Sequence, residues 1–75
     1  MENKVIETLL KESGINYQSE MFNGSQRLEI KNKAIIIIHD KEISVQYANT
    51  YACLPKKETS LRWLKWWINS YVKEK

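Results

Sequence analysis

Side chains that could carry acid, base or nucleophile chemistry are few in this chain of 75 residues. The one histidine, His39, is followed directly by Asp40, and the one cysteine is Cys53. Neighbouring residues on an extended strand point to opposite sides, so His39 and Asp40 do not form a catalytic dyad. Cys53 precedes Leu54 and Pro55, and in this apolar setting we expect a buried thiol that behaves as a small hydrophobic group. These residues predict no enzyme, no cofactor and no Cys/His metal site within one chain.

Binding chemistry is concentrated near the carboxyl end, where three tryptophans lie among basic side chains. At about 100° per residue on a helix, Trp63 and Trp67 fall within an apolar half-circle, whereas Trp66 falls opposite. The apolar half-circle also holds Leu61, Leu64, Ile68, Tyr71 and Val72. An exposed indole is typical of a binding surface. We therefore predict a partner-binding site made of Trp66, Arg62, Lys65, Asn69 and Lys73.

Basic charge is concentrated in the same part of the chain. Residues 56–75 hold six cations and two anions, whereas residues 1–25 hold two cations and four anions. Such asymmetry can steer the final helix toward an acidic surface of a protein or a nucleic acid. An ordinary solvated helix face has the same composition, so charge alone leaves these alternatives open.

The elements that position these residues are predicted from hydrophobic spacing. A first helix is expected over residues 3–13, with Asn3 as its N-cap and Gly14 as the left-handed residue that ends it. The final helix is expected to be capped by Thr59 or Ser60. Val5, Leu9 and Leu10 of the first helix are expected to meet Trp63, Leu64, Trp67 and Ile68 of the final helix and the inward side chains of the strands.

Strand-like alternation lies between the two helices. It covers the segments 17–22, 27–31, 34–38 and 43–47. Asn23 and Gly24 form a hairpin turn between the first two segments, and residues 49–55 are expected to be a connection. The sequence thus predicts one α+β domain over residues 1–75, a small antiparallel β-meander of three to four strands flanked by an N-terminal and a C-terminal helix, in the order α-β-β-β-(β)-α.

Four consecutive isoleucines occupy the predicted third strand, so both of its faces are apolar. A two-residue loop before this strand would place Ile36 and Ile38 on the face opposite Leu28. A loop one residue longer would place Ile35 and Ile37 there instead. Because two terminal helices most easily cover one face of a small sheet, we predict Ile36 and Ile38 as a candidate oligomer face. Neighbouring side chains lying over the pair are the alternative.

Two lysines, Lys56 and Lys57, stand just before the final helix. With them, the order helix, antiparallel strands, helix resembles the double-stranded RNA-binding domain over nearly the whole chain. The resemblance implies that Lys56 and Lys57 contact phosphates across the major groove and that Glu7 makes a polar contact from the first helix. The chain departs from the family at residues 23–26, which lack its Gly-Pro-x-His-like loop, and at the tryptophans, which replace small alanines.

Taken together, these features favour a non-enzymatic accessory or inhibitor protein that docks a protein partner through Trp66 and its basic surround. A homodimer is a further candidate, and nucleic-acid binding is the alternative function. Isoleucine, lysine and asparagine make up a third of the chain, which suggests an A+T-rich phage or mobile-element origin. We expect a cytoplasmic protein, because the chain has a lone cysteine, no membrane-length apolar run and no signal-peptide pattern.

Overall fold

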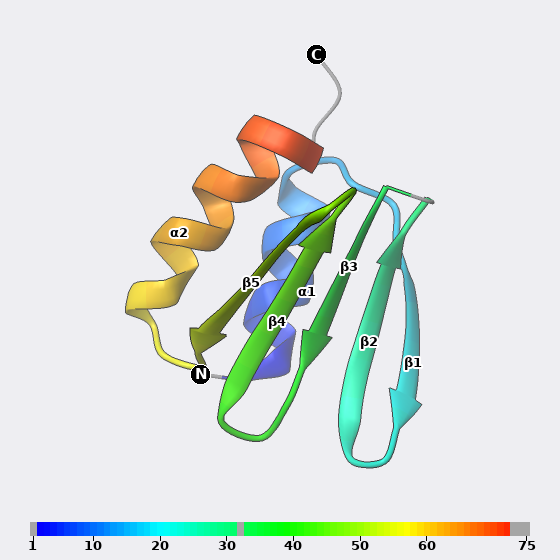
Figure 1. Cartoon of the computed structure of the whole chain (residues 1–75), viewed down its shortest axis with the longest axis vertical. Helices are drawn as coiled ribbons and strands as arrows, with labels where there is room; N and C mark the ends of the chain where they lie inside the picture. Colours follow the sequence, from blue (N-terminus) through cyan, green and yellow to red (C-terminus); the bar gives the residue numbers. More distant parts are fainter. Residues whose placement is uncertain (1, 32, 73–75) are drawn as a thin grey trace.

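The computed structural model describes residues 2–31 and 33–72. Its elements are α1 (Asn3–Glu12), β1 (Gln18–Phe22), β2 (Ser25–Ile30), β3 (Ala34–Ile38), β4 (Glu42–Tyr47), β5 (Thr50–Pro55), α2 (Thr59–Trp67) and the π-helical turn η1 (Ile68–Val72). The strands form one antiparallel sheet in sequence order, β1-β2-β3-β4-β5 (Figure 1). The predicted α+β class and meander are therefore confirmed, with five strands instead of three or four. No helix among these residues is long and apolar enough to cross a membrane.

The fifth strand replaces the connection that was expected over residues 49–55. It pairs with β4 from Tyr47 opposite Thr50 to Glu42 opposite Pro55. A tight turn joins the two strands, and its first residue, Ala48, has a positive φ of 52°. Alanine rarely adopts this conformation, so the sequence carries no ordinary turn signal at this point. The strand is made by its pairing with β4 rather than by a local pattern.

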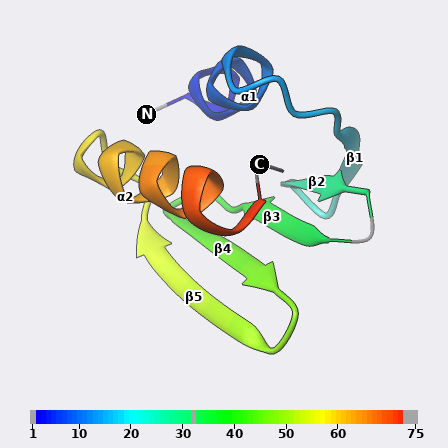
Figure 2. The same cartoon turned by 90° about the horizontal axis from the view of Figure 1, so that it is seen from above.

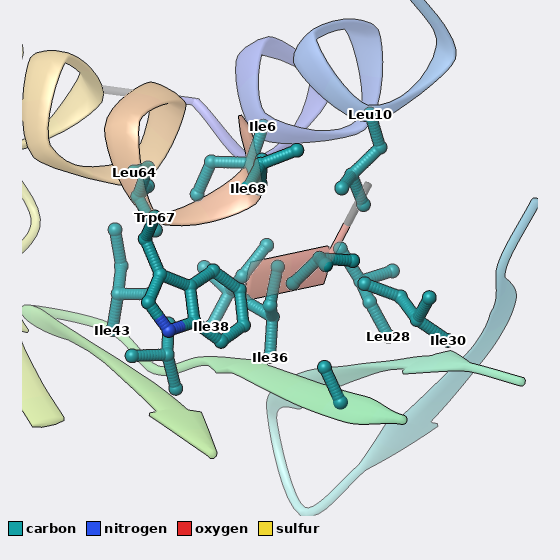
Figure 3. Close-up of a cluster of buried hydrophobic side chains, with 13 residues drawn as sticks. Ile6, Leu10, Leu28, Ile30, Ile36, Ile38, Ile43, Leu64, Trp67 and Ile68 are labelled. Carbon is teal, nitrogen blue, oxygen red and sulfur yellow. The ribbon is translucent and has the colours of Figure 1, made fainter. Parts of the chain in front are cut away.

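Both helices cover the same face of the sheet, and the core lies between the helices and that face (Figure 2). Figure 3 shows buried side chains from α1, α2, η1 and the central strands pointing toward one another. The buried apolar residues are Ile6, Leu10, Leu28, Ile30, Ala34, Ile36, Ile38, Ile43, Val45, Leu64, Trp67, Ile68 and Val72. Val5 was expected in this core but is 39% exposed, because it faces the space beside α2.

The register of β3 corrects the predicted oligomer face. Three residues separate the end of β2 at Ile30 from the start of β3 at Ala34, and Leu28 pairs with Ile36. Ile36 and Ile38 are therefore on the helix-covered face, where they are 0% and 1% exposed. The prediction that they form an open face is wrong, and the longer-loop alternative is confirmed. Ile35 and Ile37 point to the outer face and are only half-buried.

Polar side chains that were predicted as helix caps instead tie the helices to the sheet. The Asn3 Nδ2 atom donates a hydrogen bond to Gln26 Oε1 of β2 at 3.0 Å. The Ser60 hydroxyl donates to the carbonyl of Pro55 at the end of β5 at 2.6 Å. The N-cap positions are occupied by Glu2 and Glu58, neither of which makes a side-chain cap bond. The cap predictions are wrong because both polar groups find partners in the sheet.

The end of α1 follows the predicted pattern. Gly14 has a φ of 73°, and its N–H donates to the Lys11 carbonyl at 3.0 Å. The N–H of Ile15 donates to the Leu10 carbonyl at 3.0 Å. These two bonds make a Schellman end, which satisfies carbonyls that the helix leaves unpaired and directs the chain toward β1.

The π-helical turn η1 changes which residues of the C-terminal segment are buried. A turn with i→i+5 bonding contains one residue more than an α-helical turn. The side chains that follow it are therefore rotated back about the helix axis by about 100°, relative to their positions in an uninterrupted α-helix. Tyr71, predicted in the apolar half-circle, is consequently 45% exposed, and Val72 is buried at 3%. The shift also brings the Tyr71 ring to the Trp66 ring, as described below.

Candidate protein interface

Five aromatic side chains form a continuous series of ring contacts on α2, η1 and the end of β4. We call Tyr47, Trp63, Trp66, Trp67 and Tyr71 the aromatic cluster. The ring centroids are 5.8 Å apart for Tyr47–Tyr71, 5.7 Å for Tyr71–Trp66, 5.8 Å for Trp66–Trp63 and 6.3 Å for Trp63–Trp67. These separations are those of favourable aromatic pairs. The cluster therefore connects the buried core to the surface through contacting rings.

Exposure increases along the cluster from the core outward. Trp67 is 2% exposed, Trp63 is half-buried, and Trp66 is 52% exposed. The predicted exposure of Trp66 and burial of Trp67 are confirmed, whereas Trp63 lies at the edge of the core. Because the Trp66 ring packs against the Trp63 and Tyr71 rings, this indole is partly ordered in the free chain. A preorganised aromatic side chain loses less conformational entropy on binding.

The predicted basic surround is divided between two surfaces. Arg62, Lys65 and Asn69 are exposed, as predicted, and Lys73 lies outside the described residues. Arg62 and Lys65, however, line a groove between α1 and α2 rather than simply encircling Trp66. The helical spacing of about 100° per residue placed these cations correctly on the exposed side of α2. That spacing describes one helix alone, so it could not predict that α1 forms the other wall of the groove.

A polar network crosses the outer face of the sheet, the face without helices. The Ser25 hydroxyl lies 3.1 Å from His39 Nδ1, and His39 Nε2 lies 3.3 Å from the Ser44 hydroxyl, which also accepts a bond from Tyr51 at 3.3 Å. His39 thus pairs with residues of neighbouring strands and not with Asp40. Its Nδ1 partner is a hydroxyl, not the carboxylate that stabilises an imidazolium in a catalytic triad. We assign this network the role of linking the strands.

Cys53 lies on the same outer face and is exposed, so the expectation of a buried thiol is wrong. The β4–β5 register places Cys53 opposite Ser44, on the side away from the helices. The thiol donates a hydrogen bond to Glu42 Oε2 at 2.8 Å. This bond raises the pKa of Cys53 above its ordinary value, and desolvation and the charge of Glu42 raise it further. The described residues include no group of three His, Cys, Asp or Glu side chains that could hold a metal ion.

The raised pKa of Cys53 predicts slow alkylation despite the exposure of its thiol. Only the thiolate reacts, and a raised pKa leaves less thiolate at a given pH. The variant Glu42→Gln removes the negative charge, so its iodoacetamide rate should be severalfold higher near neutral pH and its pH–rate curve should move to lower pH. Glu29→Gln, a change on the same face away from the thiol, is the control and should leave the rate unchanged. Identical pH–rate curves for Glu42→Gln and the native chain would contradict this account.

No protein-family model, curated protein or solved structure matches this chain.

The lysines of the nucleic-acid alternative lie between β5 and α2. Lys57 is exposed and Lys56 is half-buried. The backbone N–H of Lys56 donates to the carbonyl of Lys41 at 2.9 Å, which joins this connection to the β3–β4 turn. Both lysines precede the first residue of α2, whereas Trp66 lies near its last residue. The structure therefore separates the predicted phosphate contacts from the predicted protein contact.

Proposed function

We propose that this protein is a non-enzymatic accessory or inhibitor protein that docks a protein partner through the aromatic cluster and the exposed polar face of α2. The observation that carries the proposal is the state of Trp66, which is 52% exposed while its ring packs on Trp63 and Tyr71. A large, partly ordered indole at the surface is the kind of side chain that supplies most of the energy of a protein interface.

Ring orientation favours a protein over a single-stranded nucleic acid. Successive bases stack on aromatic faces that are open and similarly oriented. The Trp66 and Tyr71 rings meet at 85°, edge to face, and Trp63 and Trp66 meet at 55°. Such tilted rings form a rough apolar surface that suits side chains of irregular shape better than a stack of bases.

Charge on the other large open surface also supports this choice. On the outer face of the sheet, Glu20 and Glu29 lie near Arg27, at 4.0 Å and 3.5 Å. Glu42 adds a third carboxylate on that face. Carboxylates distributed over this face weaken its attraction for phosphates.

The test is to compare Trp66→Ala with the native chain as bait for partners from the native host, and then to measure the affinity of the purified partner. Loss of an aromatic anchor costs about 2 kcal/mol or more, so affinity should fall by roughly 30-fold. Tyr51→Ala is the matched control, because Tyr51 is an aromatic residue 67% exposed on the opposite face of the sheet. If both variants bind like the native chain, the aromatic cluster is not the interface.

A charge-reversal variant separates this function from the nucleic-acid alternative. Lys56 and Lys57 precede Thr59, the first residue of α2, and Trp66 lies about 11 Å further along the helix axis. This separation exceeds the Debye length of about 8 Å at physiological ionic strength. Changing both lysines to glutamate should therefore leave partner affinity nearly unchanged. Salt-dependent retention of duplex RNA or DNA by the native chain, lost in this variant, would replace our proposal with the alternative.

A further inference from the structure

We infer that the groove between α1 and α2 is a docking site for an acidic amphipathic helix of a protein partner. This inference goes beyond the proposed function, because it assigns the groove beside the exposed polar face of α2, with which it shares Arg62 and Lys65, and the chemistry of the occupant. We call the site the helix groove. It has a volume of about 600 Å³ and is lined by residues of α1 and α2.

The floor of the helix groove is apolar. It is formed by Val5 and Leu9 of α1 and Leu61 of α2, and Thr8 lies beside them. Val5 is 39% exposed, and Leu9 and Leu61 are only half-buried. The helices thus leave between them a stripe of aliphatic side chains that neither helix covers. Such a stripe gains free energy when an apolar surface is laid on it.

The rim of the helix groove is predominantly basic. Lys4, Arg62 and Lys65 line it, against the single carboxylate of Glu12. Both salt bridges between described residues involve Arg27, so these three cations have no carboxylate of the described residues within ion-pair distance. Cations beside an apolar stripe favour an occupant that carries carboxylates on both sides of its own apolar stripe. That is the charge pattern of an acidic amphipathic helix.

The dimensions of the helix groove also fit a helix. Its α1 wall extends from Lys4 to Glu12, which corresponds to about 12 Å, or roughly two helical turns. A docked helix would place apolar residues at positions i, i+3 or i+4, and i+7 along this length. The groove is an open trough, whereas small-molecule sites enclose most of the ligand surface. A peptide helix is therefore a better occupant than a small amphiphile.

Two designed peptides of about 15 residues, a length at which isolated helices begin to form, test this inference. Both carry the same leucine stripe, flanked by glutamates in one peptide and by lysines in the other. We expect the glutamate peptide to bind the full-length ¹⁵N-labelled chain roughly tenfold tighter or more. Its amide shift changes should be centred on Val5, Leu9 and Leu61. In the triple variant Lys4→Glu, Arg62→Glu, Lys65→Glu, the preference should reverse to the lysine peptide.

Two single variants make the outcome independent of the proposed function. Val5→Asp places a charge on the floor at an exposed position, so it should abolish peptide binding in a folded protein. Trp66→Ala should leave peptide binding unchanged, although it should weaken the partner contact made through the aromatic cluster. The experiments can therefore contradict the peptide contact of the helix groove without contradicting the partner contact made through Trp66, and the reverse.

Several results would overturn the assignment of the helix groove. These are equal affinity for the two peptides, shift changes centred elsewhere, or no shift changes with millimolar glutamate peptide. Cosedimentation with phosphatidylserine vesicles that is lost in Val5→Asp would assign the groove to a membrane surface instead. Binding of duplex RNA that shifts the same amides would assign it to nucleic acid.

Discussion

Replacing Trp67 with alanine should destabilise the fold by about 3 to 5 kcal/mol, the usual cost of removing a buried aromatic side chain. Trp67 is 2% exposed, and its ring points from α2 toward the sheet (Figure 3). The ring stacks on that of Trp63 with an interplanar angle of 13°. A domain of this size has a total stability of roughly 4 to 11 kcal/mol. The variant should therefore be marginally folded at 25 °C, with a large loss of structure in urea at concentrations that leave the native chain intact.

The matched control is Trp66→Ala, the same substitution one position earlier on the same helix. Trp66 is 52% exposed, so its removal loses ring contacts with Trp63 and Tyr71 but opens no cavity in the core. Its cost should be about 1 kcal/mol. Urea unfolding followed by far-UV circular dichroism measures both values. Equal losses in the two variants would show that the helix does not face the sheet as described.

A second pair of variants tests the direction of the isoleucine side chains in β3. Ile36→Ala should cost about 2 to 5 kcal/mol, because Ile36 is 0% exposed between the sheet and the helices. Ile37→Ala should cost about 1 kcal/mol, since Ile37 is half-buried on the outer face, opposite Arg27. The substitutions are identical and adjacent, so strand propensity contributes almost equally to both.

The free energy of unfolding from urea titration checks this pair as well. The difference between the two variants reports only which face each side chain occupies. A greater loss for Ile37→Ala would mean that β3 is shifted by one residue relative to β2, as a two-residue loop would require. Such a result would also restore Ile36 and Ile38 as an open face.

Local chemistry was sufficient to predict the helices, the first hairpin and the exposure of Trp66. Asn23 and Gly24 form the predicted turn, with φ values of 48° and 80° that few other residue pairs tolerate. Trp66 and Trp67 were separated because one residue turns an α-helix by about 100°. These features depend on backbone sterics and on the geometry of a single element, and both are determined by neighbouring residues.

The candidate interface was only partly predictable. Helical spacing predicted that Trp66 is exposed and that Arg62 and Lys65 lie on the same exposed side of the helix. It did not predict that Tyr71 joins the aromatic cluster, because an α-helical period does not apply to the π-helical turn. Tyr47 comes from β4 and meets Tyr71 only in the folded chain. The helix groove could not be predicted from sequence patterns either, because its two walls are far apart in the sequence.

Tertiary structure alone decided the strand register, the fifth strand and the direction of Cys53. Side chains alternate with a period of two along a strand, so one residue in the length of a loop exchanges the inner and outer faces. A run of identical isoleucines satisfies either register locally. What selects between them is the whole set of pairings from β2 to β5 and the burial of Ile36 and Ile38 beneath both helices. The sequence determined the two helices, the first four strands and the exposed surface of the final helix, whereas long-range pairing and packing determined the fifth strand and which strand side chains face the core.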